Sequence, residues 1–200
     1  MAISMKLLLH TCCGPCAVRP LPWFSENGFD VTGFFYNPNI HPRDEFDRRA
    51  HGAEKFYAIK NVSLIVCDDY MQELWESLGA PPEAVVGRDA HIAPPNAVVG
   101  RDAHIAPPVR LLCEMCYEIR LAHTAKRARE SGFDAFSTTL LVSPYQNHEL
   151  IVEICEKASA EYGVRFFYRD FRPDFRAGQR EAREIGLYMQ KYCGCIHSAR

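Results

Sequence analysis

Five short apolar runs recur along the chain, each with the length and the β-branched or aromatic content of a buried strand. They cover residues 6–12, 31–37, 63–67, 134–141 and 164–171. Stretches with helical spacing lie between them, over residues 42–60, 114–131 and 144–163. This alternation favours an α/β fold in which helices cover both faces of a mostly parallel sheet.

Length and composition predict a single domain over residues 1–200. A chain of 200 residues, 48% of them hydrophobic, can bury roughly 70% of its unfolded surface in one core. No apolar run approaches the roughly 18–20 residues that span a bilayer, so we expect a soluble chain without a membrane partner. Nine cysteines are too sparse for a disulfide-stapled secreted domain and favour metal ligands or reactive thiols in a reducing cytoplasm.

Seven of the nine cysteines fall into three tight groups. The groups are C-C-x-x-C, C-x-x-C and C-x-C, formed by Cys12, Cys13, Cys16, Cys113, Cys116, Cys193 and Cys195. The first group follows the first predicted strand, at the sheet edge where such folds bind ligands. Together the groups predict a metal site, either a structural zinc or a 4Fe-4S cluster. Cys67 and Cys155 are interpreted as core residues.

The adjacent pair Cys12 and Cys13 suggests two roles within one motif. Neighbouring side chains of an extended segment point to opposite sides, so we expect these thiols to serve different centres. Gly14 and Pro15 then turn the chain, which lets Cys16 approach the same place. Because four thiolates close one site, the remaining three argue for a second metal or a reactive thiol beside it.

Longer segments around the cysteines carry a resemblance that covers nearly the whole chain. In spacing and order, HTCCGPC, FFYNPNIHP, CEMCYEIRL, FSTTLLVSPYQNHELI and YGVRFFYRDFR with YMQKYCGC are similar to motifs of the cobalamin-independent epoxyqueuosine reductase family (QueH-like). The resemblance implies an α/β sheet related to the adenine nucleotide alpha hydrolase-like fold. It also implies reduction of epoxyqueuosine to queuosine at the wobble position of tRNA, with electrons from an unidentified donor.

The same resemblance implies a 4Fe-4S cluster with a mononuclear iron next to it. The family's metal-binding cysteines match Cys12, Cys13, Cys113, Cys116, Cys193 and Cys195, while Cys16 stands where some members have aspartate. We take Cys13 and Cys16 as candidates for catalysis as well as metal binding. A cluster can supply single electrons, and an iron can act as a Lewis acid on the epoxide oxygen. His10 is the candidate proton donor, with a satisfied core histidine as the alternative.

Polar side chains at two strand ends are candidates for substrate binding. Tyr36, Asn37 and Asn39 could read polar base edges, although asparagine before proline is also ordinary turn chemistry. Thr138 and Thr139 could contact phosphate or ribose, or cap the helix that follows. Residues 165–200 carry eight Lys/Arg against four acidic residues, which suits either a phosphate-bearing partner or a solvated helix face.

A tandem repeat interrupts the pattern of strands and helices. AVVGRDAHIAPP occurs at residues 84–95 and again at 97–108. Two copies this short form neither a solenoid nor an array. We interpret the segment of about 80–109 as a loop insertion, produced by a recent duplication or by an error in the sequence.

Two other functions would use similar cysteine groups. A zinc-stabilised nucleic-acid-binding module would hold the C-x-x-C and C-x-C pairs but does not require CCGPC. A heterodisulfide-reductase-type iron-sulfur thiol redox enzyme contains a Cys-Cys-Gly signature but lacks the FFYNPN and YCGC segments. Acid-labile sulfide in the purified protein would exclude the zinc-stabilised module. Reduction of epoxyqueuosine in tRNA would distinguish the epoxyqueuosine reductase from the thiol redox enzyme.

Overall fold

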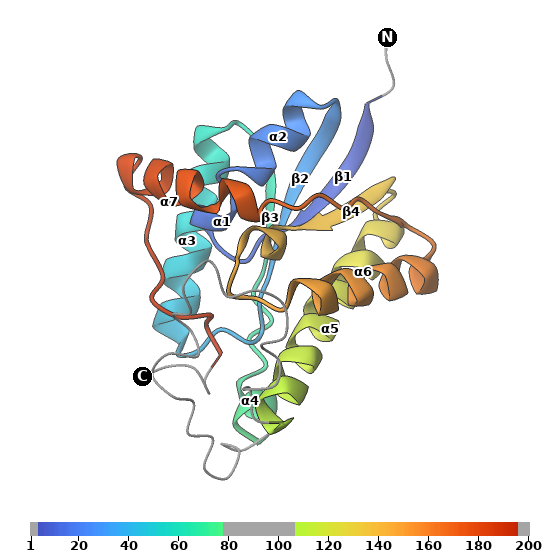
Figure 1. Ribbon diagram of the computed structural model, residues 1–200, viewed down its shortest axis with the longest axis vertical. Helices are drawn as coiled ribbons and strands as arrows, with labels where there is room; N and C mark the ends of the chain where they lie inside the picture. The colour runs from blue at the N-terminus through green and yellow to red at the C-terminus, as the bar shows by residue number, and fades with distance from the viewer. Residues whose placement is uncertain (1–3, 78–106, 196–200) are drawn as a thin grey trace.

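The computed structural model describes residues 4–77 and 107–195, and its centre is a five-stranded sheet (Figure 1). The strands lie in the order β3-β2-β1-β4-β5, and every neighbouring pair is parallel. Their bounds are Met5–His10 (β1), Phe29–Tyr36 (β2), Leu64–Cys67 (β3), Ala135–Thr138 (β4) and Arg165–Phe166 (β5). The predicted α/β fold with a parallel sheet is therefore confirmed.

Helices connect the strands and supply both layers around the sheet. They are Gly14–Ala17 (α1), Pro20–Glu26 (α2), Arg43–Ile59 (α3), Gln72–Ser77 (α4), Pro107–Glu130 (α5), His148–Tyr162 (α6) and Phe175–Glu184 (α7). The three helices expected from periodicity correspond to α3, α5 and α6. None of these helices in the described residues is both long enough and apolar enough to cross a membrane.

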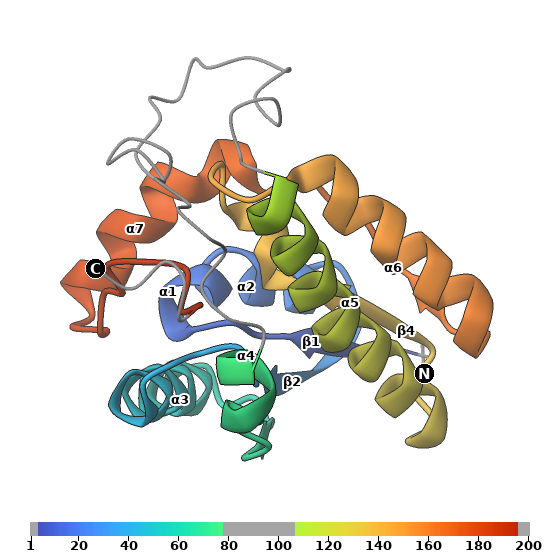
Figure 2. The same ribbon diagram turned by 90° about the horizontal axis from the view of Figure 1, so that it is seen from below.

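Alternating side chains of β2 show that helices cover both faces of the sheet. The rings of Phe34 and Tyr36 stack on His123 of α5, with centroid distances of 5.9 and 4.0 Å. Phe35 lies between them in sequence and packs against Phe46 of α3, at 5.3 Å. Successive strand residues point to opposite faces, so α3 and α5 lie on opposite sides of the strands (Figure 2).

The winding of the chain reverses at the central strand. From β1 the chain moves outward through β2 to β3, and then it returns to pair β4 with the other side of β1. In parallel sheets of this kind, the crevice at the carboxyl ends of the two strands beside the reversal is the usual ligand site. Here those strands are β1 and β4, which precede the CCGPC segment and Thr139.

Two strands are shorter than the apolar runs predict. The fourth apolar run predicts an extended strand to residue 141, but β4 ends at Thr138. The Thr138 side chain accepts a hydrogen bond from the Leu140 N–H and caps a 3₁₀ turn, Thr139–Val142 (η2). The fifth run forms only two strand residues. Most of the predicted insertion lies outside the described residues, and its end is helical because α5 begins at Pro107.

A close approach between α1 and α3 depends on Gly14. A Cβ atom at Gly14 would lie 2.8 Å from the carbonyl carbon of Gly52, whereas a Cβ at Gly52 would meet nothing nearer than a Tyr188 carbon at 3.8 Å. We expect Gly14→Ala to lower the free energy of unfolding by about 1–3 kcal/mol, because helix backbone must move. Gly52→Ala is the matched control and should be neutral or slightly stabilising. Urea unfolding of both variants checks this, and equal stabilities would contradict it.

Candidate metal centre

Three cysteine side chains converge directly after β1. The Sγ atoms of Cys12 and Cys13 are 3.7 Å apart, and those of Cys12, Cys13 and Cys16 all lie within 4.8 Å of one another. The expectation that Cys12 and Cys13 point to opposite sides is therefore wrong. Strand β1 ends at His10 and α1 begins at Gly14, so strand alternation does not extend through the turn that carries both residues.

Local hydrogen bonds make Cys12 the most acidic thiol of the three. Hydrogen bonds from Cys13 and Cys16 lower its pKa well below the ordinary value, and the charge of Arg120 and the Thr139 hydroxyl act in the same direction. Thr139 donates to the Cys12 sulfur at 3.4 Å and accepts from the Cys12 N–H at 3.1 Å. Burial raises the pKa of Cys13. Cation binding would release the protons that remain on the other thiols.

The other two cysteine groups face the same cavity. It has a volume of about 610 Å³ and is lined by Cys12, Cys16, Cys113, Cys116, Cys193 and Cys195, among other residues. Burial raises the pKa of Cys113 to about 12, with further contributions from Cys193, Cys116 and Cys195. All seven grouped cysteines thus belong to one region, which could hold a metal. Cys155 is fully buried in the core, as predicted, and Cys67 is partly buried and packs against the core cluster.

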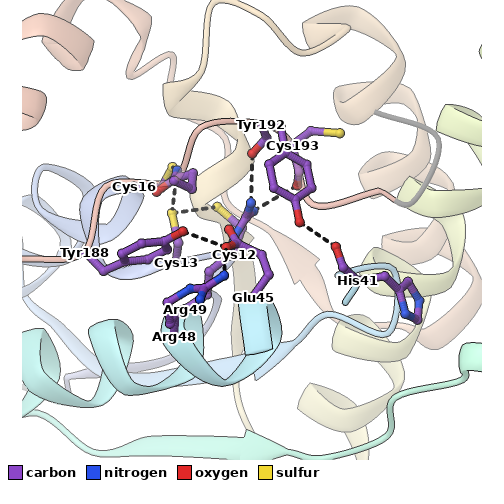
Figure 3. A network of polar contacts seen from close by, with 11 residues as sticks. Cys12, Cys13, Cys16, His41, Glu45, Arg48, Arg49, Tyr188, Tyr192 and Cys193 are labelled. Atoms are coloured by element: carbon purple, nitrogen blue, oxygen red, sulfur yellow. Dashed lines mark hydrogen bonds and ion pairs between the residues drawn. The ribbon is translucent and has the colours of Figure 1, made fainter. Parts of the chain in front are cut away.

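A buried ion pair on α3 holds the last cysteine group in place (Figure 3). The Arg49 Nε donates to Glu45 at 2.7 Å, while its two terminal nitrogens donate to the carbonyl oxygens of Tyr192 and Cys193, at 2.8 and 3.0 Å. Tyr188 donates to the second Glu45 oxygen at 2.6 Å. Burial alone would raise the pKa of Glu45, but the hydrogen bonds from Tyr188 and Arg49 hold it below its ordinary value.

The turn at Gly194 fits closely against this pair. Gly194 has φ +104°, and a Cβ there would lie 3.0 Å from Arg49 Nη1 and 2.9 Å from Ile40. The His41 N–H donates to the Gly194 carbonyl at 2.8 Å. The glycine of YCGC is therefore required by both its backbone conformation and the space around it.

His10 is a neutral, fully buried residue beneath the cysteines. Burial lowers its pKa to about 3, and the nearby Arg120 charge contributes. Its Nδ1 lies 2.9 Å from the Thr138 hydroxyl and its Nε2 lies 3.2 Å from the Tyr36 carbonyl. Because Thr138 also accepts from the Leu140 N–H, the consistent assignment has Thr138 donating to Nδ1 and Nε2–H donating to Tyr36. Both nitrogens are thus engaged away from the cavity.

Asn39 alone, of the five predicted substrate-binding residues, lines the cavity. Its buried side-chain oxygen has no hydrogen-bond partner within residues 4–77 and 107–195. Tyr36 stacks on α5, and Asn37 bonds to Thr11 and Arg120. Thr138 caps η2 and Thr139 supports Cys12. The positions of these four residues favour internal roles.

Sequence reasoning missed the charged residues that surround the cysteines. Glu45 and Arg49 are four residues apart on a predicted helix, and Arg120 follows Cys116 by the same spacing, which places each pair on one helix face. Gln190 was also missed, and its amide donates to the Cys13 sulfur at 3.0 Å. The helical spacing could have indicated the two arginines, whereas nothing local indicates Gln190.

Comparison with known proteins decides the family. A family model described as Epoxyqueuosine reductase QueH matches residues 7–84 and 105–200. The chain belongs to the QueH family. The residues left out of that match, 85–104, lie within the tandem repeat.

Curated members of the QueH family resemble this chain over nearly its whole length. An epoxyqueuosine reductase QueH of Dehalococcoides mccartyi is 34% identical, over 98% of this chain and 93% of the relative. One from Thermotoga maritima is 32% identical, over 96% and 89%. A solved deacetylase from the teicoplanin biosynthesis pathway is similar in fold alone, with a TM-score of 0.50 and 11% identity over 90% of this chain and 83% of that one.

The buried state of His10 predicts a pH dependence of stability. Folded His10 stays neutral down to about pH 3, whereas an unfolded histidine gains a proton below about pH 6.5. Stability of the metal-free protein should therefore fall as the pH drops through this window, by up to about 1.4 kcal/mol per pH unit from this residue. His10→Gln should flatten the profile by that amount in denaturant unfolding between pH 4 and 7. Parallel profiles would contradict the assignment.

Proposed function

We propose that this chain reduces epoxyqueuosine to queuosine in tRNA, using a 4Fe-4S cluster and an adjacent iron held by its grouped cysteines. The observation that carries the proposal is the convergence of three cysteine groups on one cavity. Membership of the QueH family supports the substrate and the reaction. Seven thiols exceed the four that close a cluster, so ligands remain for a second metal. The Cys12 and Cys13 sulfurs lie 3.7 Å apart, so their orientation does not itself require two centres.

The reaction removes the epoxide oxygen as water and leaves a carbon-carbon double bond. It consumes two electrons from a donor and two protons. When bound, the iron-sulfur group supplies electrons one at a time and the second iron provides Lewis acidity. The chain contributes the thiols that line the cavity, of which Cys12, Cys16 and Cys116 are buried. His10 does not line this cavity, so its position supports a structural role rather than proton donation.

The walls of the cavity suit a nucleic-acid substrate. Helix α7 contributes Arg176, Arg180 and Arg183 to the lining, and Lys191 follows nearby. No ion pair joins these four cations to a carboxylate of the described residues. Unpaired cations beside a cavity attract phosphates. Tyr145 and Phe175 also line it, with ring centroids 5.6 Å apart, and offer aromatic faces on which an unpaired base can stack.

The direct experiment is anaerobic purification followed by assay. We expect a brown protein that contains iron and acid-labile sulfide and that, with a chemical reductant, converts epoxyqueuosine in tRNA to queuosine. Protein that holds zinc and no sulfide would instead support the nucleic-acid-binding module. A cluster-containing protein that leaves epoxyqueuosine unchanged would reject the reductase proposal.

Cysteine variants test which thiols hold the metal. Cys113→Ser should remove most of the visible absorbance and sulfide, because a cluster loses a ligand. Cys155→Ala is the control, since this thiol lies in the core and should cost stability without loss of metal. Iron and sulfide per chain give the answer. Full metal content in the Cys113 variant, or a colourless Cys155 variant, would contradict the ligand assignment.

Charge removal on α7 tests the tRNA surface. The double variant Arg176→Ala/Arg180→Ala should raise the KM for tRNA by about tenfold or more, leave metal content intact, and reduce the slope of log affinity against log salt by about one to two. Arg127→Ala/Arg129→Ala, on exposed positions of α5, removes the same charge away from the cavity and should behave as wild type. Equal effects of the two double variants would indicate that only net charge matters.

A further inference from the structure

Arg120 is a buried cation that meets no carboxylate in the part of the chain that the structure describes. Its side chain is 4% exposed, and it forms no ion pair with any acidic residue of the described segments. Glu45 is the one buried acidic residue in those segments, and Arg49 already neutralises it. An uncompensated buried charge is costly, so among the described residues the counter-charge of Arg120 comes from another kind of group.

The contacts of Arg120 point to the cysteines. Its Nη1 lies 3.7 Å from the Cys116 sulfur, and its Nη2 donates to the Asn37 side-chain oxygen at 2.7 Å. Asn37 is itself fixed, because its amide donates to the Thr11 carbonyl at 2.9 Å. The Arg120 Nε is buried and has no hydrogen-bond partner among the residues that the structure describes. Arg120 also lines the cavity that the grouped cysteines share.

We propose that Arg120 is the counter-cation of the metal centre, held in place by Asn37, and that it raises both the reduction potential of the centre and its affinity for metal. Thiolate-ligated metal groups carry net negative charge. A fixed positive charge and a hydrogen bond to a ligand sulfur favour the more negative, reduced form and stabilise the anionic metal-thiolate complex itself. The redox part of this inference rests on the proposed function, whereas the affinity part does not.

The reduction potential of the purified holoenzyme provides the first test. Arg120→Gln removes the charge and should shift the potential to more negative values. Arg120→Lys keeps the charge and should restore most of the shift. Arg127→Gln is the matched control, because it removes the same charge from an exposed position on the same helix, and should leave the potential unchanged. A wild-type potential in Arg120→Gln, or an equal shift in the control, would overturn the proposal.

Cobalt(II) binding to the metal-free protein provides a second readout that requires no cluster. The affinity for cobalt is measured by titration of the sulfur-to-cobalt absorption band. It should weaken by about tenfold or more in Arg120→Gln, change little in Arg120→Lys, and stay unchanged in Arg127→Gln. Unchanged affinity in all three variants would reject the role. If wild-type protein binds cobalt but assembles no cluster, the proposed reductase function is wrong. The cobalt affinities of the variants would still test the role of Arg120.

Asn37→Asp is the variant to measure if loss of the Arg120 side chain prevents folding. It leaves Arg120 in place but puts a carboxylate at the oxygen that now lies 2.7 Å from Nη2, so the cation is neutralised. The potential and the cobalt affinity should fall as they do in Arg120→Gln. Wild-type values of both in Asn37→Asp would contradict the counter-cation role.

Discussion

The ion pair between Glu45 and Arg49 is the contact on which the site depends. Both side chains are almost fully buried, at 1% and 3% exposure, and the guanidinium binds two main-chain carbonyls of a segment about 144 residues further along the chain. Loss of one partner from such a buried pair costs about 3–5 kcal/mol, because the other charge is left unpaired. The pair therefore specifies where the YCGC segment lies, and so brings the last two cysteines to the sheet edge built by β1 and β4.

Two buried arginines give the centre different kinds of support. Arg49 is neutralised by a carboxylate and acts through the geometry of its hydrogen bonds. Arg120 meets no carboxylate of the described residues and acts through its charge. The exposed arginines of α7 form a third set, which also lines the cavity. An anionic metal group and an anionic polymer would thus be served by separate cations, so that substrate binding and redox chemistry can be altered independently.

Much of the site could be predicted because ligand spacing is a local property of the sequence. The three cysteine groups, the parallel sheet and the position after β1 all follow from short patterns. The orientation of Cys12 and Cys13 could not be predicted, because it depends on where β1 stops. Likewise, Asn37 has the chemistry to bind a base, yet it turns inward, because its partners Thr11 and Arg120 come from other segments. Local patterns identify candidate groups, and tertiary contacts decide which of them face the cavity.

Cysteines from all three groups line one cavity, which we propose to hold iron. Anomalous diffraction at the iron absorption edge, from crystals of anaerobically purified protein, measures this most directly. We expect iron density inside the cavity, in contact with sulfur atoms from the groups that contain Cys12, Cys113 and Cys193. Iron bound by Cys12, Cys13 and Cys16 alone, with unligated thiols at Cys113, Cys116, Cys193 and Cys195, would contradict it.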